Sequence, residues 1–377
     1  MLTKEGCLIR QKRLWDTLPE SVEWVIITNP RHVKYFSNIW VNPVSFSAGQ
    51  SVWLHMKRSG KVTALSDNFT FKSLSGEAFV DETVEEVWYD GVHSVENRDH
   101  MPGQALKKTF GTLHLSEGIF EWDSFPAAGF ETVEGEPPSD LVLGDVIKKL
   151  RRQKDPDEVE HLKSCMGACE AGHVAGKEIV KPGVTDMDVY RAVNNAVLEH
   201  VGRPCVVYGD FRATNAETPK VGGLPVSYTL QDGDLFLLDY SVVLEGYRSD
   251  FTNTIAVGTP SPEQDALLNA CLASLESGEK VLRSNATCRE VFATCSKRLV
   301  KEGFNPLPHH AGHGLGLEHP EPPVFVPEST DILMNGDVVT VEPGNYIPGV
   351  GGVRIERNYL ITKKGSENLS HHKISLK

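Results

Sequence analysis

The sequence predicts a mixed α/β (α+β) protein, with a small α/β domain at residues 1–140 and a larger domain at residues 141–377. Three observations support this prediction. The chain has 377 residues, enough for two domains of about 100–200 residues each. The acidic segment ETVEGEPPSD (131–140) contains two adjacent prolines and no periodicity, which is typical of a domain boundary. After this segment, the same series of helix caps and strands occurs twice.

The composition excludes several classes of protein. Hydrophobic residues make up 40% of the chain, which argues against disorder. The formal net charge of −13 argues against a nucleic-acid partner, which requires a basic surface. The N-terminal segment has no apolar core and no long apolar run follows, so we expect neither a signal peptide nor a membrane span. The seven cysteines contain no CxxC pair, so we expect reduced thiols, a cytoplasmic protein and no zinc–thiolate site.

Short apolar runs predict the strands of the first domain. WVIIT (24–28), SVWLHM (51–56) and KVTAL (61–65) have the composition of strands, and the last two flank a Lys-Arg-Ser-Gly turn that predicts a hairpin. LHL near residue 114 predicts another strand. We identify no catalytic cluster in this domain. The basic run from Lys148 to Lys154 predicts the solvated face of a linker helix.

The second domain contains two copies of a helix–helix–hairpin unit, which predicts a pseudo-twofold arrangement with one sheet covered by helices. Its landmarks recur in order, about 100 residues apart, by the usual signals of helix and strand starts. They are helix starts at Asp155 and Ser261, caps at Thr185 and Thr287, Gly-Asp strand starts at Gly233 and Gly336, and carboxylates at Asp239 and Glu342, then at Asp250 and Glu356.

The carboxylates of the two hairpins predict a cation site. The apolar run Phe236–Leu238 leads into Asp239, and a turn near Leu244-Glu245-Gly246 places Asp250 on the same face, opposite or diagonal, within about 5–8 Å. Like charges at that distance repel each other unless a cation lies between them. The alternative is a pair of solvent-facing acids at a strand end. Because the second hairpin adds two more acids, we expect about two divalent cations.

Histidines supply possible nitrogen ligands beside these acids. Four of them, His309, His310, His313 and His319, fall in the glycine-containing segment HHAGHGLGLEH, and His313 lies between two glycines that permit close backbone approach. One histidine with four carboxylates forms an oxygen-rich site, suited to Mn²⁺, Co²⁺, Fe²⁺ or Zn²⁺. The expected chemistry is attack of a metal-bound hydroxide on a carbonyl group.

Together these motifs resemble the creatinase/prolidase/aminopeptidase P family, the M24 metallopeptidases with the pita-bread fold. Asp239, Asp250 eleven residues later, the His–Gly loop, EPG and GGVRIE carry the resemblance, and NPRHVKYFSNI and LRRQKDPDEVEHL are similar to the family's N-terminal domain and linker helix. It implies Asp239, Asp250, His313, Glu342 and Glu356 as ligands of two divalent metals, Mn²⁺ first, with Co²⁺, Zn²⁺ or Fe²⁺ as alternatives. It further implies His309 and His319 as catalytic residues, and Lys220, Tyr346 and Arg354 as substrate-binding residues.

The chain departs from the family pattern at four positions. Lys220 in NAETPK replaces a histidine, and His319 in HPEPP comes one position early. Asn253 and Arg357 replace an arginine and an aspartate. The ligands are intact but the residues around the substrate are altered.

The resemblance implies an Xaa-Pro aminopeptidase or Xaa-Pro dipeptidase that acts as a cytoplasmic homodimer on a small peptide. One alternative is another enzyme of the same fold, a creatinase-like hydrolase or lyase acting on a small charged compound. A non-enzymatic binding module is a third reading, which the intact ligands disfavour.

Overall fold

The computed structural model describes residues 1–74 and 76–377. These residues form two compact units, residues 1–151 with 156–158, and residues 152–155 with 159–377. These units are defined by contacts between residues and are not a test of where a domain begins. The domain boundary near residue 140 therefore stays a prediction. No helix among the described residues is long and apolar enough to cross a bilayer.

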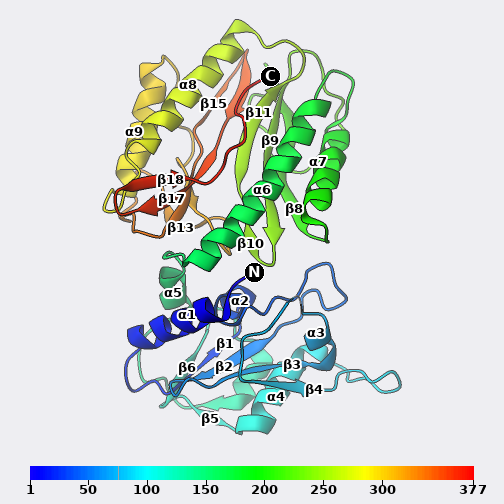
Figure 1. Ribbon diagram of the computed structural model, residues 1–377, viewed down its shortest axis with the longest axis vertical. Coiled ribbons are helices and arrows are strands. Elements are labelled where there is room, and N and C mark those ends of the chain that lie inside the picture. Colours follow the sequence, from blue (N-terminus) through cyan, green and yellow to red (C-terminus); the bar gives the residue numbers. More distant parts are fainter. Residues whose placement is uncertain (75) are drawn as a thin grey trace. The chain divides into compact units, whose positions relative to one another are not determined.

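The first unit is built on a mixed sheet with the strand order β4-β3-β2-β1-β6 (Figure 1). The predicted strands are confirmed, and β2 and β3 form the predicted antiparallel hairpin. Buried aromatic side chains of Trp24, Trp53 and Phe120 form much of the core between this sheet and its helices. The elements are α1 (Lys4–Thr17), β1 (Trp24–Ile27), α2 (Pro30–Ser37), β2 (Trp53–Lys57), β3 (Val62–Asp67), α3 (Asn68–Lys72), β4 (Glu82–Glu86), α4 (Met101–Phe110), β5 (Leu113–His114), β6 (Gly118–Phe120), β7 (Val133–Glu134) and α5 (Leu143–Leu150).

The second unit contains the two predicted copies, each with two helices followed by antiparallel strands. Figure 1 shows α6 and α7 beside one group of strands and α8 and α9 beside the other. The first copy comprises α6 (Pro156–Ile179), α7 (Asp186–Val201), β8 (Val206–Thr214), β9 (Leu235–Leu244), β10 (Tyr247–Arg248) and β11 (Phe251–Ala256). The second comprises α8 (Pro262–Glu279), α9 (Cys288–Lys301), β12 (His313–Gly314), β13 (Glu321–Val324), β14 (Val338–Val341), β15 (Gly344–Ile347), β16 (Gly351–Arg354), β17 (Arg357–Thr362) and β18 (Gly365–Asn368).

The caps that revealed the repeat form as predicted. Thr185 and Ser261 form capping boxes at α7 and α8, and the side chain of Thr287 accepts a hydrogen bond at the start of α9. The two copies are joined directly, because the N–H of Glu356 donates to the carbonyl of Thr252 on β11 (3.0 Å). The strands of both copies therefore reach one another without an intervening helix, but their ladders form separate sheets, β10-β9-β11 with β8, β13-β12-β14-β17-β18 and β15-β16, rather than the single sheet that was expected.

Packing of α6 on β9 determines which side chains of β9 face the helices. Gly172 and Gly176 of α6 lie so close to β9 that an added Cβ would be 2.2 Å from the Tyr240 hydroxyl and 2.8 Å from Leu238 Cδ2, respectively. Since side chains alternate along a strand, Asp239 points to the opposite face. The strand β9 continues past this acid to Leu244, as the turn predicted near Leu244-Glu245-Gly246 requires.

The expectation of a solvated basic run is wrong for Arg152 and Lys154, which are both buried. Arg152 forms an ion pair with Asp337 (2.8 Å), and Lys154 forms one with Glu321. Each charge has a partner far along the chain, which a local pattern of basic residues does not reveal.

Candidate metal centre

Strand register in the first copy brings Asp239 and Asp250 to one face. The two-residue turn Glu245-Gly246 pairs Tyr247 with Leu244, and the same register pairs Asp239 with Thr252. Asp250 therefore lies diagonally across from Asp239, one of the two predicted arrangements. Glu245 and Gly246 have φ angles of 49° and 94°, as a tight hairpin turn requires.

The second copy places Glu342 and Glu356 in the corresponding positions. Val341 pairs with Arg357 and Gly344 pairs with Arg354, so the common register brings Glu342 opposite Glu356. On β14, Val339 and Val341 enter the core against α8 and α9, so alternation turns Glu342 to the opposite side, where it lines the cavity.

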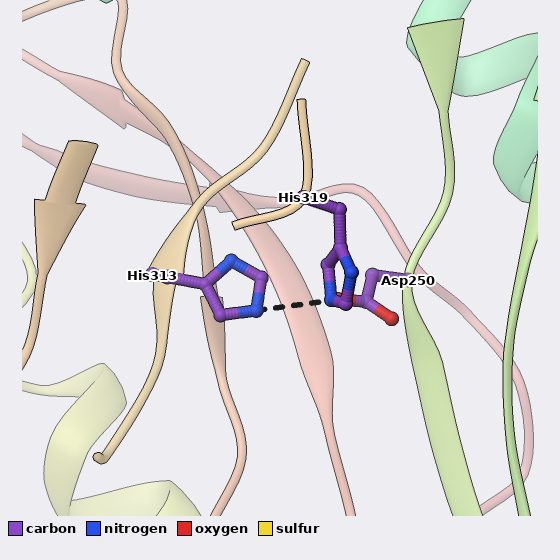
Figure 2. A group of neighbouring side chains, drawn as sticks. All are labelled: Asp250, His313 and His319. Carbon is purple, nitrogen blue, oxygen red and sulfur yellow. Dashed lines mark ion pairs between the residues drawn. The ribbon is translucent and has the colours of Figure 1, made fainter. Parts of the chain in front are cut away.

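Two histidines meet these acids from the loop after α9. His313 Nε2 lies 3.4 Å from Asp250 Oδ2 and 3.5 Å from Glu342 Oε1, and His319 Nε2 lies 2.8 Å from the same Asp250 oxygen. Figure 2 shows the side chains of Asp250, His313 and His319 converging. Gly312 permits this approach: its φ is 149°, and a Cβ there would lie 2.1 Å from the Thr340 carbonyl oxygen.

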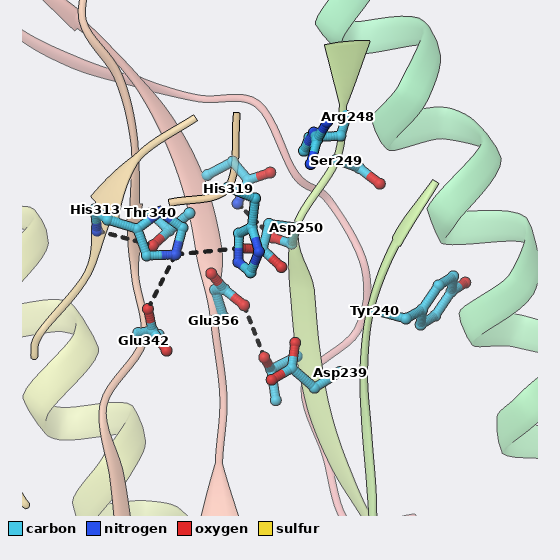
Figure 3. A network of polar contacts seen from close by, with 12 residues as sticks. Asp239, Tyr240, Arg248, Ser249, Asp250, His313, His319, Thr340, Glu342 and Glu356 are labelled. Atoms are coloured by element: carbon cyan, nitrogen blue, oxygen red, sulfur yellow. Dashed lines mark hydrogen bonds and ion pairs between the residues drawn. The ribbon is translucent and has the colours of Figure 1, made fainter. Parts of the chain in front are cut away.

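The four acids and these histidines line a cavity of about 230 Å³. Figure 3 shows the four carboxylates gathered between the strands of the two copies, with the Tyr240 ring pointing away toward the helix. Asp239, Asp250 and Glu356 offer oxygen atoms within 4.8 Å of one another, and His313, Glu342 and Glu356 form a second such group.

The electrostatics of the cavity show how costly this crowding of acids is. Burial raises the pKa of Asp239 to about 6, and the neighbouring acids add to the effect while Arg354 opposes it. Burial also raises the pKa of Glu356 well above its usual value, with a further contribution from Asp250. Burial opposes protonation of His313, but its hydrogen bond to Asp250 and the charge of Glu342 outweigh burial and raise the pKa of His313 to about 9.

The donor set fits divalent metal ions. Glu356 Oε1 is buried and has no hydrogen-bond partner among the described residues, although its other oxygen accepts from the Thr252 hydroxyl (2.7 Å). Several buried carboxylates can stay ionised together only when positive charge compensates them. Oxygen atoms with imidazole nitrogen are ligands for Mn²⁺, Co²⁺, Fe²⁺ and Zn²⁺.

Beside this cavity, Arg354 connects the acids to His309. Its guanidinium forms ion pairs with Asp239 and with Asp210 (2.9 Å) and donates to the Tyr346 hydroxyl (3.2 Å). That hydroxyl lies 3.3 Å from His309 Nε2. Burial lowers the pKa of His309 to about 4, so its imidazole is neutral at neutral pH.

Lys220 lies at the edge of this group rather than on a free loop. Its Nζ is 5.3 Å from the centre of the Tyr346 ring, and the side chain is exposed. The NAETPK segment is tied to the β15–β16 hairpin, because the Gly349 N–H donates to the Ala216 carbonyl (2.8 Å). Gly352 is so close to this segment that a Cβ would lie 2.1 Å from the Pro219 carbonyl oxygen.

Asp210 and Thr252 were not identified from the sequence, and His310 was named there only as a member of the histidine cluster. Asp210 on β8 pairs with Asp239 and also lines the cavity, and His310 Nδ1 lies 3.2 Å from Glu342 Oε1. Thr252 donates to Glu356. No sequence pattern predicted β8, so Asp210 could not be identified as a cavity residue. Thr252 could have been found, because side-chain alternation on β11 places it on the same face as Asp250.

Comparisons with known proteins agree with this geometry. Residues 160–363 match the model of metallopeptidase family M24. An uncharacterized peptidase of Staphylococcus haemolyticus is 32% identical over 236 residues, which cover 61% of this chain and 66% of that relative. An uncharacterized peptidase of Staphylococcus aureus strain RF122 is 30% identical over 356 residues, covering 92% of this chain and 94% of the relative.

Solved structures show the same fold over nearly the whole chain. An Xaa-Pro dipeptidase from Bacillus anthracis has a TM-score of 0.75 at 23% identity and covers 99% of both chains. An X-Pro aminopeptidase from Thermotoga maritima has a TM-score of 0.75 at 19% identity, covering 100% of this chain and 99% of that one. The predicted family and its two-part fold are thereby confirmed, and the chain belongs to metallopeptidase family M24.

Proposed function

We propose that this protein is a metal-dependent hydrolase that cleaves an N-terminal residue from a following proline, as an Xaa-Pro dipeptidase or aminopeptidase. The observation that carries the proposal is the convergence of Asp239, Asp250, His313, Glu342 and Glu356 on one cavity. The names of the structural relatives from Bacillus anthracis and Thermotoga maritima support the Xaa-Pro substrate class.

The five residues would hold two divalent ions per chain, Mn²⁺ first, with Co²⁺, Zn²⁺ or Fe²⁺ as alternatives. When bound, such ions polarise a carbonyl and lower the pKa of a coordinated water. The remaining work falls to residues of the chain. His309 is neutral and lies beside the Tyr346 hydroxyl, so its imidazole is suited to hydrogen-bond an oxygen of the substrate.

Around the cavity we propose three substrate-binding residues, Tyr346, Arg354 and Lys220, with His319 as a second catalytic histidine. Lys220 supplies positive charge at the edge of the cavity, which suits a peptide with a free carboxylate, and Arg354 positions the Tyr346 hydroxyl. We also propose, from the family resemblance, a cytoplasmic homodimer; light scattering on the purified protein tests the dimer.

The first experiment measures metal content and activity together. Wild-type protein and the Asp250→Ala and Glu342→Ala variants are analysed for bound metal and assayed with Xaa-Pro and Xaa-Ala dipeptides. We expect wild-type protein to hold two ions and prefer Xaa-Pro, and both variants to lose metal and activity. Wild-type metal content in both variants would contradict the ligand assignment.

The second experiment separates His309 from the ligands. His309→Ala is expected to keep its metal and lose about 10²–10³-fold in kcat, the usual loss for one stabilising hydrogen bond. Loss of metal along with activity would instead make His309 a ligand.

A second candidate function is that of a hydrolase or lyase acting on a small charged compound. Lys220 is the one residue that favours it. No ion pair of Lys220 is found in the part of the chain that the structure describes, so its ammonium is free to meet an anionic group. The variant Lys220→His restores the family residue. If the metal-loaded wild type does not cleave Xaa-Pro dipeptides but this variant does, the second candidate is correct; efficient wild-type cleavage unchanged by the substitution rejects it.

A further inference from the structure

Polar contacts hold the loop that carries His319 against the rest of the second unit. Glu321 forms an ion pair with Lys154, and both side chains are almost fully buried. The backbone N–H of Arg248 donates to the Gly316 carbonyl (3.2 Å), and its guanidinium donates to the Leu317 carbonyl (3.1 Å). The position of His319 is therefore determined by the fold on both sides of the loop.

His319 has the spacing of a metal ligand relative to its neighbours. Two ligands at about 2.0–2.2 Å from one ion lie about 2.8–3.6 Å apart, depending on whether the coordination is octahedral or tetrahedral. The Nε2 atoms of His319 and His313 lie 2.8 Å and 3.4 Å from Asp250 Oδ2. All three residues offer ligand atoms within 4.8 Å of one another, and their converging side chains are visible in Figure 2.

We infer that the catalytic role proposed for His319 is that of a direct metal ligand, a sixth donor beside the five named above, and this assignment rests on the metal centre proposed above. The centre then has two unlike sides that share Asp250. One side, formed by Asp250, His313 and His319 with Glu342 beside His313, has two nitrogen donors, and the other, formed by Asp239, Asp250 and Glu356, has only oxygen donors.

The unlike donors give the two sides different metal preferences. Imidazole-rich sites suit Zn²⁺, Co²⁺ and Fe²⁺, whereas all-carboxylate sites suit Mn²⁺ and other hard ions. We therefore expect Co²⁺ or Zn²⁺ to load in two steps, the first on the side with His313 and His319. The competing interpretation is that His319 only donates a hydrogen bond to Asp250 and orients it, as outer partners of ligands do.

A cysteine in place of His319 distinguishes a ligand from an outer partner. A thiolate bound to Co²⁺ produces a charge-transfer band in the near ultraviolet, and an unbound thiol does not. His319→Cys is titrated with Co²⁺, with His310→Cys as the matched control. His310 lies in the same cavity and contacts Glu342, but it belongs to neither side of the centre. Wild-type protein supplies the baseline for the seven native cysteines.

We expect the band in His319→Cys, rising to one Co²⁺ per chain, and its absence in His310→Cys and in wild type. His319→Cys that binds two Co²⁺ ions without the band would overturn the inference. X-ray absorption spectroscopy of wild-type protein with one equivalent of Zn²⁺ tests the inference without a variant, because it counts the imidazole ligands of the ion. Two imidazole ligands support the inference, and a single one refutes it. Failure of the wild type to bind Co²⁺ or Zn²⁺ would instead reject the proposed metal centre.

Discussion

Breaking the buried ion pair between Lys154 and Glu321 on one side is expected to cost the second unit several kcal/mol of stability. Their side chains are only 2% and 3% exposed. Removing one partner of a buried pair commonly costs about 3–5 kcal/mol, because the remaining charge is still desolvated but loses this ion pair. Lys154→Met retains the apolar stem and removes the ammonium. Urea titration at pH 7.5 should show the free energy of unfolding reduced by this amount.

The same variant should have a characteristic pH dependence. Without the ammonium, the pKa of Glu321 in the folded state rises above its unfolded value of about 4.3. The folded state then binds a proton more readily than the unfolded state, so the loss of stability is greatest above that raised pKa and shrinks as the pH falls. The difference in unfolding free energy between variant and wild type should therefore be smaller at pH 5 than at pH 7.5.

Two further variants make the test decisive. Lys149→Met removes an exposed lysine of the same basic run and should change stability by less than about 0.5 kcal/mol. The double variant Lys154→Met/Glu321→Gln should recover much of the lost stability, because neither buried charge remains. The reasoning is refuted if Lys154→Met is as stable as Lys149→Met, or if the double variant is no more stable than the single one.

Two other predictions concern buried groups in the two units. Burial, with Lys57 and Lys61, lowers the pKa of His55 to about 4. Between pH 6.5 and 4, the imidazole of His55 binds a proton only in the unfolded chain, so the free energy of unfolding falls by about 2 kcal/mol from pH 7 to pH 5. In urea titrations, the variant His55→Phe should lack this pH-dependent loss of stability. Gly312→Ala should displace His313 and abolish metal binding, measured by Co²⁺ titration, whereas Gly349→Ala, with positive φ but open space, should retain it.

The sequence predicted the carboxylates well because local rules fix them. A two-residue turn and the alternation of side chains determine the register of β9 and β11, and hence the diagonal placement of Asp239 and Asp250. The helix caps predicted the repeat for the same reason, since a cap involves residues only three apart.

What the sequence could not predict depends on contacts between distant segments. Asp210 enters the cavity only because β8 pairs with β9 across a long connection, and no local pattern predicted β8. The sequence around Lys154 is typical of a solvated basic run, and its burial depends on an ion pair with Glu321, far along the chain. Local patterns contain no information about such partners.

The division of the acids and His313 between the two repeats has a consequence for assembly. Asp239 and Asp250 come from one repeat, while His313, Glu342 and Glu356 come from the other. An ion bound by both repeats acts as a removable cross-link, which favours the state in which they are joined and adds RT ln(1 + [M]/Kd) to the free energy of unfolding. A chelator should consequently lower the melting temperature, and a fragment ending near residue 260 should bind the ion far more weakly than the full chain, even if its hairpin is formed.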